Sequence, residues 1–143
     1  MTTDWSSFDR GVFLVNVLGI VHKDGEILIG RREKDPYVKE LSWTFPGGRP
    51  AYDKSLEESL KDEIKKKTSL DVEIKKLIFA RIPEEKGEFI LLYYYCEVAG
   101  GKEKSGEKFD EVKWVKPSEL KKYITTSLHP ELMDFLKKIG TKK

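Results

Sequence analysis

Three charged residues near the middle of the chain have the spacing best suited to chemistry. Glu63, Lys66 and Lys67 lie in the helix-forming run 55–67. Positions three and four residues apart are neighbours on a helix, so both ammonium groups are expected beside the carboxylate. A carboxylate is a ligand for Mg²⁺, whereas lysine offers none and repels a dication. Ammonium groups bind phosphate as point charges. The residues by themselves favour a solvated run of lysines, and the alternative is a pair of cations that binds phosphate.

Arginines and glycines elsewhere in the sequence extend this candidate site. Arg31, Arg32 and Arg49 carry guanidinium groups that suit phosphate, or else form ordinary surface charge. Gly47 and Gly48 are explained better by a tight turn than by ligand contacts. Gly48 is nevertheless counted among the candidate substrate-binding residues, together with Arg31, Arg49, Lys66 and Lys67.

The elements that must position these residues follow from local patterns. Residues 11–21 and 26–32, joined by Asp24-Gly25, predict a β-hairpin. Four further segments have the composition of strands: 41–45, which ends at Pro46-Gly47-Gly48, and 72–83, 88–98 and 109–115. Residues 100–106 predict a polar, mobile loop. Within 88–98, three consecutive tyrosines alternate across the strand, so at least one is expected to face the core or a cleft.

Three helices are expected, one beginning at a capping box and two beginning at prolines. Ser55 and Glu58 form a capping box, which predicts that a helix begins at Ser55. Its apolar face is expected to contain Leu56, Leu60 and Ile64. Two later helices are expected to begin at prolines, Pro117 and Pro130. Strands on both sides of a helix, followed by helices, indicate an α+β domain with a mixed sheet between helices.

From Gly48 onwards, the sequence resembles the Nudix box, whose pattern is G-x5-E-x7-R-E-U-x-E-E-x-G-U with U an aliphatic residue. The frame runs without a gap and places Glu63 and Ile64 at the invariant E-U pair. Residues 26–32 and 110–120 resemble the second strand of this family and its late strand. The resemblance implies one Nudix-like domain over residues 1–143, with the box at 48–70. The implied fold is a Nudix-type α/β/α sandwich with a mixed β-sheet.

The resemblance also implies which residues would do the chemistry. In active relatives, three box acids hold Mg²⁺ against a diphosphate, and here these positions are Glu63, Lys66 and Lys67. One carboxylate does not hold Mg²⁺ firmly by itself, so Glu63 is a partial metal ligand and ordinary catalysis is expected to be weak or lost. Glu111 is implied as an added metal ligand or base, as late-strand acids are in some relatives, or else as a charge at a sheet edge.

Three further box positions differ from the pattern. The first acid of the box is Lys54 and its arginine is Asp62, which reverses both charges. If these family residues form a pair, that pair is expected to persist with inverted sign. Ser69 replaces the last glycine of the box, so the helix is expected to end without a left-handed glycine. Thr68 and Ser69 would supply local hydrogen bonds instead.

Composition limits the classes of protein that fit. The 143 residues are 38% hydrophobic and 36% charged, with a net charge of +2, which leaves nucleic-acid binding unsupported. Cys96, the only cysteine, lies in a strand pattern and is expected in the core. The sequence shows no apolar run of about 20 residues and no signal-peptide pattern. A cytoplasmic protein without membrane contact is therefore expected.

The preferred interpretation is a Nudix-fold protein that binds a nucleoside diphosphate linked to another group, with weak or lost hydrolysis. One alternative is an active pyrophosphohydrolase for a nucleotide sugar, ADP-ribose or a nucleoside triphosphate. It would use Mg²⁺ or Mn²⁺ on Glu63 together with Glu111, Asp110 or Glu57. The other alternative is a protein-interaction module without catalysis. The expected cofactor is Mg²⁺ or Mn²⁺ if the protein is active, and the alternative is no cofactor. A homodimer is one of the two expected assembly states, beside a monomer. The irregular box has some similarity to that of nucleotide-sugar hydrolases.

Overall fold

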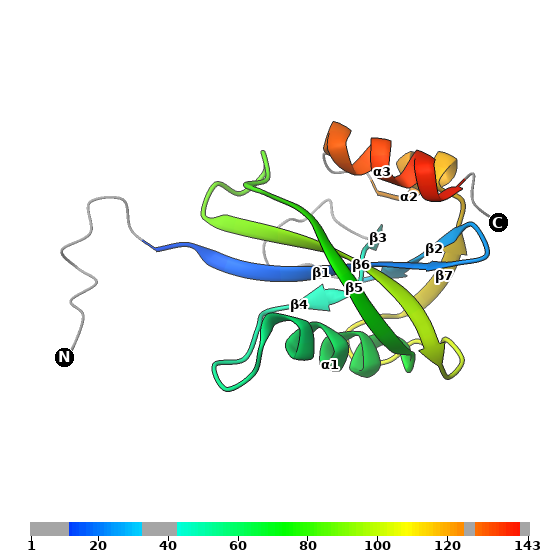
Figure 1. The fold of residues 1–143 in the computed structure, drawn as a ribbon, viewed down its shortest axis with the longest axis horizontal. Helices are drawn as coiled ribbons and strands as arrows, with labels where there is room; N and C mark the ends of the chain where they lie inside the picture. Colours follow the sequence, from blue (N-terminus) through cyan, green and yellow to red (C-terminus); the bar gives the residue numbers. More distant parts are fainter. Residues whose placement is uncertain (1–11, 33–42, 125–127, 141–143) are drawn as a thin grey trace.

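A mixed β-sheet between helices makes up the part of the chain that this computed structural model describes, residues 12–32, 43–124 and 128–140. One face of the sheet is covered by α1 and the other by α2 and α3 (Figure 1). The expected α+β sandwich is therefore confirmed. In chain order the elements are β1 (Leu14–Lys23), β2 (Glu26–Arg31), β3 (Trp43–Thr44), β4 (Gly47–Gly48), α1 (Leu56–Thr68), β5 (Asp71–Arg81), β6 (Phe89–Gly100), β7 (Glu111–Val115), the 3-10 turn η2 (Pro117–Glu119), α2 (Leu120–Tyr123) and α3 (Pro130–Gly140).

The strand order creates an opening beside β1. The sheet runs β3-β2-β1-β6-β5, with β4 also beside β1 and β7 beside β2. Strands β1 and β6 are parallel along most of their length, whereas β1 and β2 pair only at His22↔Ile27 and Lys23↔Glu26. Beyond that point β4 pairs with β1 instead, through Val17↔Gly48. Because β1 and β2 separate there, β4 takes the place beside β1 that β2 leaves.

The hairpin of β1 and β2 is confirmed at its turn. Asp24 and Gly25 have φ angles of 52° and 80°. Positive φ at both central residues is the geometry of a type I′ turn, which matches the twist of paired strands. The first two residues of the predicted strand 41–45 lie outside the described residues.

Gly47 and Gly48 do not form the predicted tight turn. They form β4 and pair with β1, and neither is among the described residues with positive φ. The reason for glycine is close approach. A Cβ on Gly47 would lie 2.0 Å from the carbonyl oxygen of Val17, and one on Gly48 would lie 2.9 Å from Cδ of Glu63. Only a residue without a side chain allows both contacts.

Helix α1 begins as expected but buries a different face. Ser55 is its N-cap, and Ser55 Oγ accepts a hydrogen bond of 3.1 Å from the amide of Glu58. Leu60 and Ile64 are fully buried, whereas Leu56 is 37% exposed. The buried face continues towards the C-terminus, with Lys67 and Thr68 also buried. Counted from Leu60, these are positions i+4, i+7 and i+8, the stripe of a helix that packs on a sheet.

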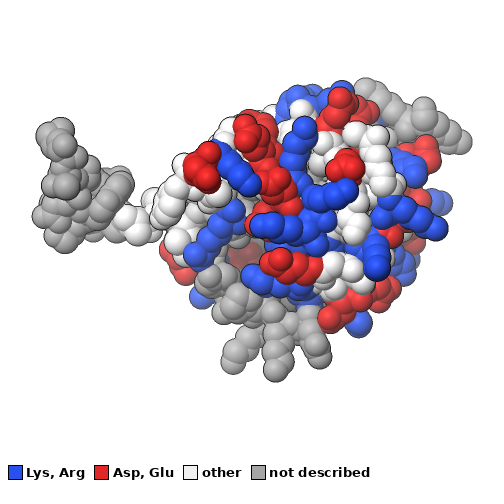
Figure 2. Space-filling model, turned by 90° about the horizontal axis from the view of Figure 1, so that it is seen from below, with Lys and Arg blue, Asp and Glu red and all other residues white. Residues whose placement is uncertain are grey.

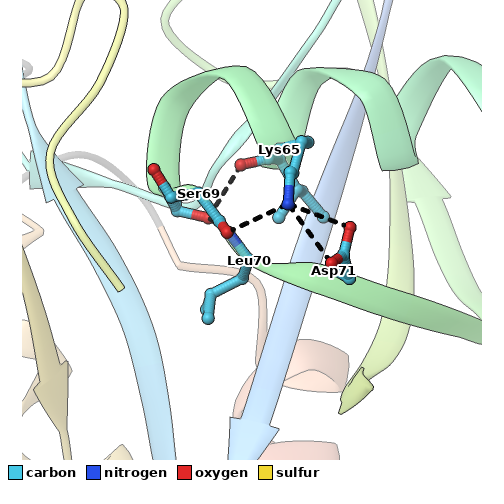
Figure 3. A network of polar contacts seen from close by, with 6 residues as sticks. Lys65, Ser69, Leu70 and Asp71 are labelled. Atoms are coloured by element: carbon cyan, nitrogen blue, oxygen red, sulfur yellow. Dashed lines mark hydrogen bonds and ion pairs between the residues drawn. The ribbon is translucent and has the colours of Figure 1, made fainter. Parts of the chain in front are cut away.

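The end of α1 keeps the left-handed geometry without glycine. Ser69 has φ 66°, and its amide donates to the carbonyl of Lys65 at 3.0 Å. The helix therefore ends without a left-handed glycine, as expected, but Ser69 takes the left-handed conformation in its place. Thr68 supplies the expected local hydrogen bond, to Ile64 O at 2.7 Å. Figure 3 shows that Lys65 Nζ also contacts Ser69 O, at 3.4 Å, and the carboxylate of Asp71, at 3.2 Å. These contacts fix the corner between α1 and β5.

The loop between β6 and β7 is bound to this same helix end. Three loop amides donate to the last carbonyls of α1, at 2.9 to 3.1 Å: Lys104 to Thr68, Gly106 to Lys67 and Glu107 to Lys66. The last carbonyls of a helix have no partner within it, so these bonds satisfy them. The sequence predicted a mobile loop at 100–106, and the structure instead attaches it beside Lys67.

Two apolar clusters, one on each face, fill the space between sheet and helices. Tyr93 and Tyr94 are both buried but belong to opposite clusters, which confirms the predicted alternation. Cys96 is fully buried, and burial raises the pKa of its thiol to about 12.

The helices predicted at Pro117 and Pro130 are both present. Within the described ranges, none of the helices has the length and apolar character needed to cross a membrane.

Candidate functional site

A cavity of about 440 Å³ lies where the opening beside β1 meets the C-terminal half of α1. Part of its apolar wall comes from the sheet, with Leu18, Leu91 and Tyr93, and part from Phe45 between β3 and β4. Charged side chains line the rest: the basic residues Arg32, Arg49, Lys67, Arg81, Lys86 and Lys108, and the acidic residues Glu63, Glu85 and Glu107. Basic groups outnumber acidic groups by two to one in this cavity. The arrangement favours an anionic small molecule.

The ammonium group of Lys67 lies at the junction of α1 and β4. Lys67 Nζ donates a hydrogen bond to the carbonyl oxygen of Gly47 and lies 3.5 Å from Oε2 of Glu63. The Lys67 side chain is 10% exposed and that of Glu63 is 21% exposed. A backbone carbonyl and a carboxylate therefore converge on one cation, which the protein itself supplies.

The position of Lys67 has an electrostatic cost. Burial lowers its pKa, the charge of Glu63 opposes that shift, and the charges of Arg32 and Lys108 add to it. Desolvation disfavours the charged form of a buried amine, whereas a nearby carboxylate favours it. The cavity thus holds this cation against the repulsion of two other cations.

Lys66, which the sequence placed in the same site, lies elsewhere. It is exposed on α1 and is absent from the cavity lining. Its charge acts on Asp62 and helps to lower the pKa of that carboxyl, after the larger effect of Lys54. Only Lys67 falls on the stripe that continues from Leu60 and Ile64, so packing of the helix selects one lysine and excludes its neighbour.

The charge-reversed pair predicted from the box is present. Lys54 Nζ donates to Oδ2 of Asp62, across the loop before α1. The hydrogen bond and the charge of Asp62 raise the pKa of Lys54, and Lys54 lowers that of Asp62. Both side chains are more than 40% exposed, so the pair holds the loop against the helix without contributing much stability.

The remaining predicted site residues divide into two groups. Arg49 and Gly48 line the cavity with Glu63, and so does Arg32. Arg31 and Glu111 lie opposite each other in the pairing of β2 with β7, are exposed, and do not line the cavity. The structure therefore does not bring Glu111 to Glu63. Two further acids weighed as alternative ligands are also exposed outside the cavity: Glu57 and Asp110.

Several cavity residues were missed by the sequence analysis. Arg81, Glu85 and Lys86 come from the end of β5 and the loop after it, and Glu107 and Lys108 come from the loop attached to α1. No local pattern distinguishes them from surface charge, because the sheet topology brings them to the cavity. For Lys67 a signal existed, since its spacing from Leu60 and Ile64 continues the apolar stripe.

The divalent metal that the box resemblance implies does not fit the groups at this position. Mg²⁺ requires about six oxygen ligands in octahedral geometry. The two oxygens that converge here, from Gly47 and Glu63, already contact the Lys67 ammonium, which would repel a dication. Within the described ranges, no three side chains of His, Cys, Asp or Glu form a group able to hold a metal ion.

Comparison with known proteins agrees with the fold and with the box. The NUDIX domain model matches residues 13–136, so the chain belongs to the NUDIX domain family. An ADP-ribose pyrophosphatase of Methanocaldococcus jannaschii is 29% identical over 103 residues, covering 70% of this chain and 60% of that protein. The chain thus matches less than two thirds of this relative's length.

Solved structures of the family share the architecture. A NUDIX hydrolase from Nitrosomonas europaea superimposes with a TM-score of 0.74 at 19% identity, covering 89% of this chain and 72% of that one. An ADP-ribose pyrophosphatase from Streptococcus suis gives a TM-score of 0.69 at 16% identity, over 91% and 94% of the two chains. At such identities the likeness shows the fold, which is the predicted Nudix sandwich.

Proposed function

We propose that this protein binds a nucleoside diphosphate linked to another group, with the Lys67 ammonium serving where active relatives use a divalent metal. The observation that carries the proposal is the contact of Lys67 with both Gly47 O and the Glu63 carboxylate. A fixed cation between these groups attracts the diphosphate without recruiting a metal ion. In this proposal Lys67 and Arg49, which line the cavity, contact the phosphates, and the exposed Lys66 does not.

The same replacement weakens hydrolysis. A metal ion accelerates attack on phosphorus by activating a bound water molecule and by neutralising developing charge. An ammonium group supplies charge, but it has no open coordination position at which water would be activated. Binding is therefore retained in this proposal while turnover is weak or lost.

The ligand class follows from the cavity and the relatives. A volume of about 440 Å³ falls within the usual range for small-molecule sites. Two relatives are named ADP-ribose pyrophosphatases, which makes ADP-ribose the first compound to test.

The proposal includes a single domain and a cytoplasmic location, where nucleotides are abundant. A homodimer remains a prediction that light scattering would check.

One observation favours the alternative of an active hydrolase. Glu107 lines the cavity with Glu63, so two carboxylates are available there even though Glu111 is not. If these acids hold Mn²⁺ or Mg²⁺ once a ligand is bound, turnover would depend on the metal and disappear in Glu63→Gln. The third possibility, an interaction module, predicts that no nucleotide binds.

The test is a binding and turnover panel. Purified protein is incubated with ADP-ribose, UDP-glucose, diadenosine polyphosphates and nucleoside triphosphates, in Mg²⁺, Mn²⁺ or EDTA. Product is measured by chromatography and affinity by calorimetry. We expect binding that EDTA leaves unchanged, little turnover, and loss of binding in Lys67→Met. Lys61→Met is the matched control, since it removes a lysine charge from an exposed position of the same helix.

Metal-dependent turnover that is lost in Glu63→Gln would instead establish the hydrolase. Absence of binding across the panel would reject the proposed function and favour the interaction module.

A further inference from the structure

Lys108 has a backbone conformation that its residue type disfavours. Its φ is 64°, one of three positive values among non-glycine residues in the described part of the chain. The other two, at Asp24 and Ser69, occur in a hairpin turn and at a helix end, where the conformation is common. Lys108 is the third residue of a turn closed by the hydrogen bond from Phe109 N to Gly106 O, at 3.1 Å. With positive φ, that position favours glycine or asparagine.

The surrounding structure holds this turn on both sides. Before it, the amides of Gly106 and Glu107 donate to carbonyls at the end of α1, at 2.9 and 3.1 Å. After it, the amide of Asp110 donates to Arg31 O at 2.9 Å, and the ring of Phe109 is buried against Gly30. A Cβ on Gly30 would lie 2.2 Å from that ring. Strain of this kind persists where neighbouring contacts determine it, and it is common at functional sites.

Lys108 also differs from the other cations of the cavity in its partners. Lys67 contacts Glu63 and Gly47, Lys86 lies 3.9 Å from the carboxylate of Glu88, and Arg81 donates to Tyr93. The ammonium of Lys108 has no hydrogen bond or ion pair with any side chain of residues 12–32, 43–124 or 128–140. It is exposed at the cavity lining, where its charge reaches Lys67.

The two lysines come from different elements and are held in different ways. Lys67 comes from α1 and is fixed by internal contacts, whereas Lys108 comes from the loop before β7 and is held only through its backbone. In Figure 2, which shows the face that carries α1, basic and acidic side chains alternate over the surface.

We propose that Lys108 is a specificity-determining residue whose ammonium binds the anionic group of the ligand at the cavity lining, on the same side as Lys67. The inference rests on the proposed function, since the anionic group is the diphosphate. The strained turn then has a purpose: it places a cation at a position where glycine would be more stable. Removing the side chain is therefore predicted to weaken binding without lowering stability.

The test is Lys108→Gly, measured by thermal unfolding and by calorimetry with ADP-ribose and with inorganic diphosphate in EDTA. We expect the melting temperature to stay the same or to rise by about 2 °C, because the strain is relieved. Affinity should fall about tenfold, because a charge-assisted contact is lost. Lys108→Asn, which tolerates the same backbone, should weaken binding to a similar extent.

Ser69→Gly is the matched control, since it relieves the same backbone conformation outside the cavity lining and should raise stability with no change in affinity. If wild-type protein binds and Lys108→Gly binds within twofold of it, the role of Lys108 is rejected and the proposed function stands. If wild-type protein binds neither compound, the proposed function itself fails. A Lys108→Gly protein that melts at lower temperature would contradict the assignment of strain.

Discussion

A double-mutant cycle on Lys67 and Glu63 measures how strongly the internal cation is held. The variants are Lys67→Met, Glu63→Gln and the double variant. At 3.5 Å, two unit charges attract by about 5 kcal/mol at an effective dielectric constant of about 20. The exposure of Glu63, 21%, admits solvent screening, so we expect a coupling energy of about 1–3 kcal/mol. Urea unfolding followed by tryptophan fluorescence gives the four free energies of unfolding.

The single and double variants are expected to differ in the direction of their stability change. Each single change leaves a poorly solvated partner, whereas the double change removes both charges and the cost of burying them. The double variant should therefore be about as stable as wild type, or more stable, while Glu63→Gln alone is clearly less stable. A coupling energy within about 0.3 kcal/mol of zero would refute the account of Lys67 as a cation held by these groups.

Four further predictions concern single residues of the fold. Ser69→Gly should stabilise the protein by about 0.5–1 kcal/mol in thermal unfolding, because glycine adopts φ 66° without strain; a loss of stability would contradict this. Gly47→Ala should destabilise it by more than about 3 kcal/mol, or prevent folding, because the new Cβ would lie 2.0 Å from Val17 O; a urea midpoint near that of wild type would show that β4 lies elsewhere. The pKa of Lys67 is lowered, so the unfolded chain binds more protons between the folded and unfolded pKa values, and stability should rise with pH through that alkaline window. The rise is measured as the free energy of unfolding of wild type minus that of Lys67→Met at each pH. A difference that does not change with pH would show that the amine is not buried. Burial raises the pKa of Cys96 to about 12, so native protein should react with iodoacetamide at least about 1,000-fold more slowly than a model thiol, and as fast as one after unfolding.

Local sequence signals accounted for most of the fold. The type I′ turn at Asp24-Gly25, the Ser55 cap and the two prolines depend on conformational preferences of single residues, which a sequence displays directly. The left-handed Ser69 was not predicted, because its conformation is imposed by the packing of α1 against β5 and overrides the preference of serine.

The candidate site was predictable where the box frame or helix periodicity fixed the positions of its residues. Glu63 and the inverted pair Lys54–Asp62 came from the box frame, and both are found where that frame placed them. The choice between Lys66 and Lys67 needed the buried stripe of α1, which extends beyond the apolar residues. Lys108 reaches the cavity because loop amides bind the end of a distant helix, and no short-range pattern encodes such a contact.

The central claim is that a side-chain cation replaces the metal, and binding of ADP-ribose to wild type and to Lys67→Glu in EDTA and in Mn²⁺ tests it most directly. Lys67→Glu restores a box acid beside Glu63 and removes the ammonium. We predict that calorimetry gives one affinity for wild type in both conditions, and that Lys67→Glu binds in Mn²⁺ but not in EDTA. Wild-type binding that disappears in EDTA, with Mn²⁺ restoring it, would contradict the claim.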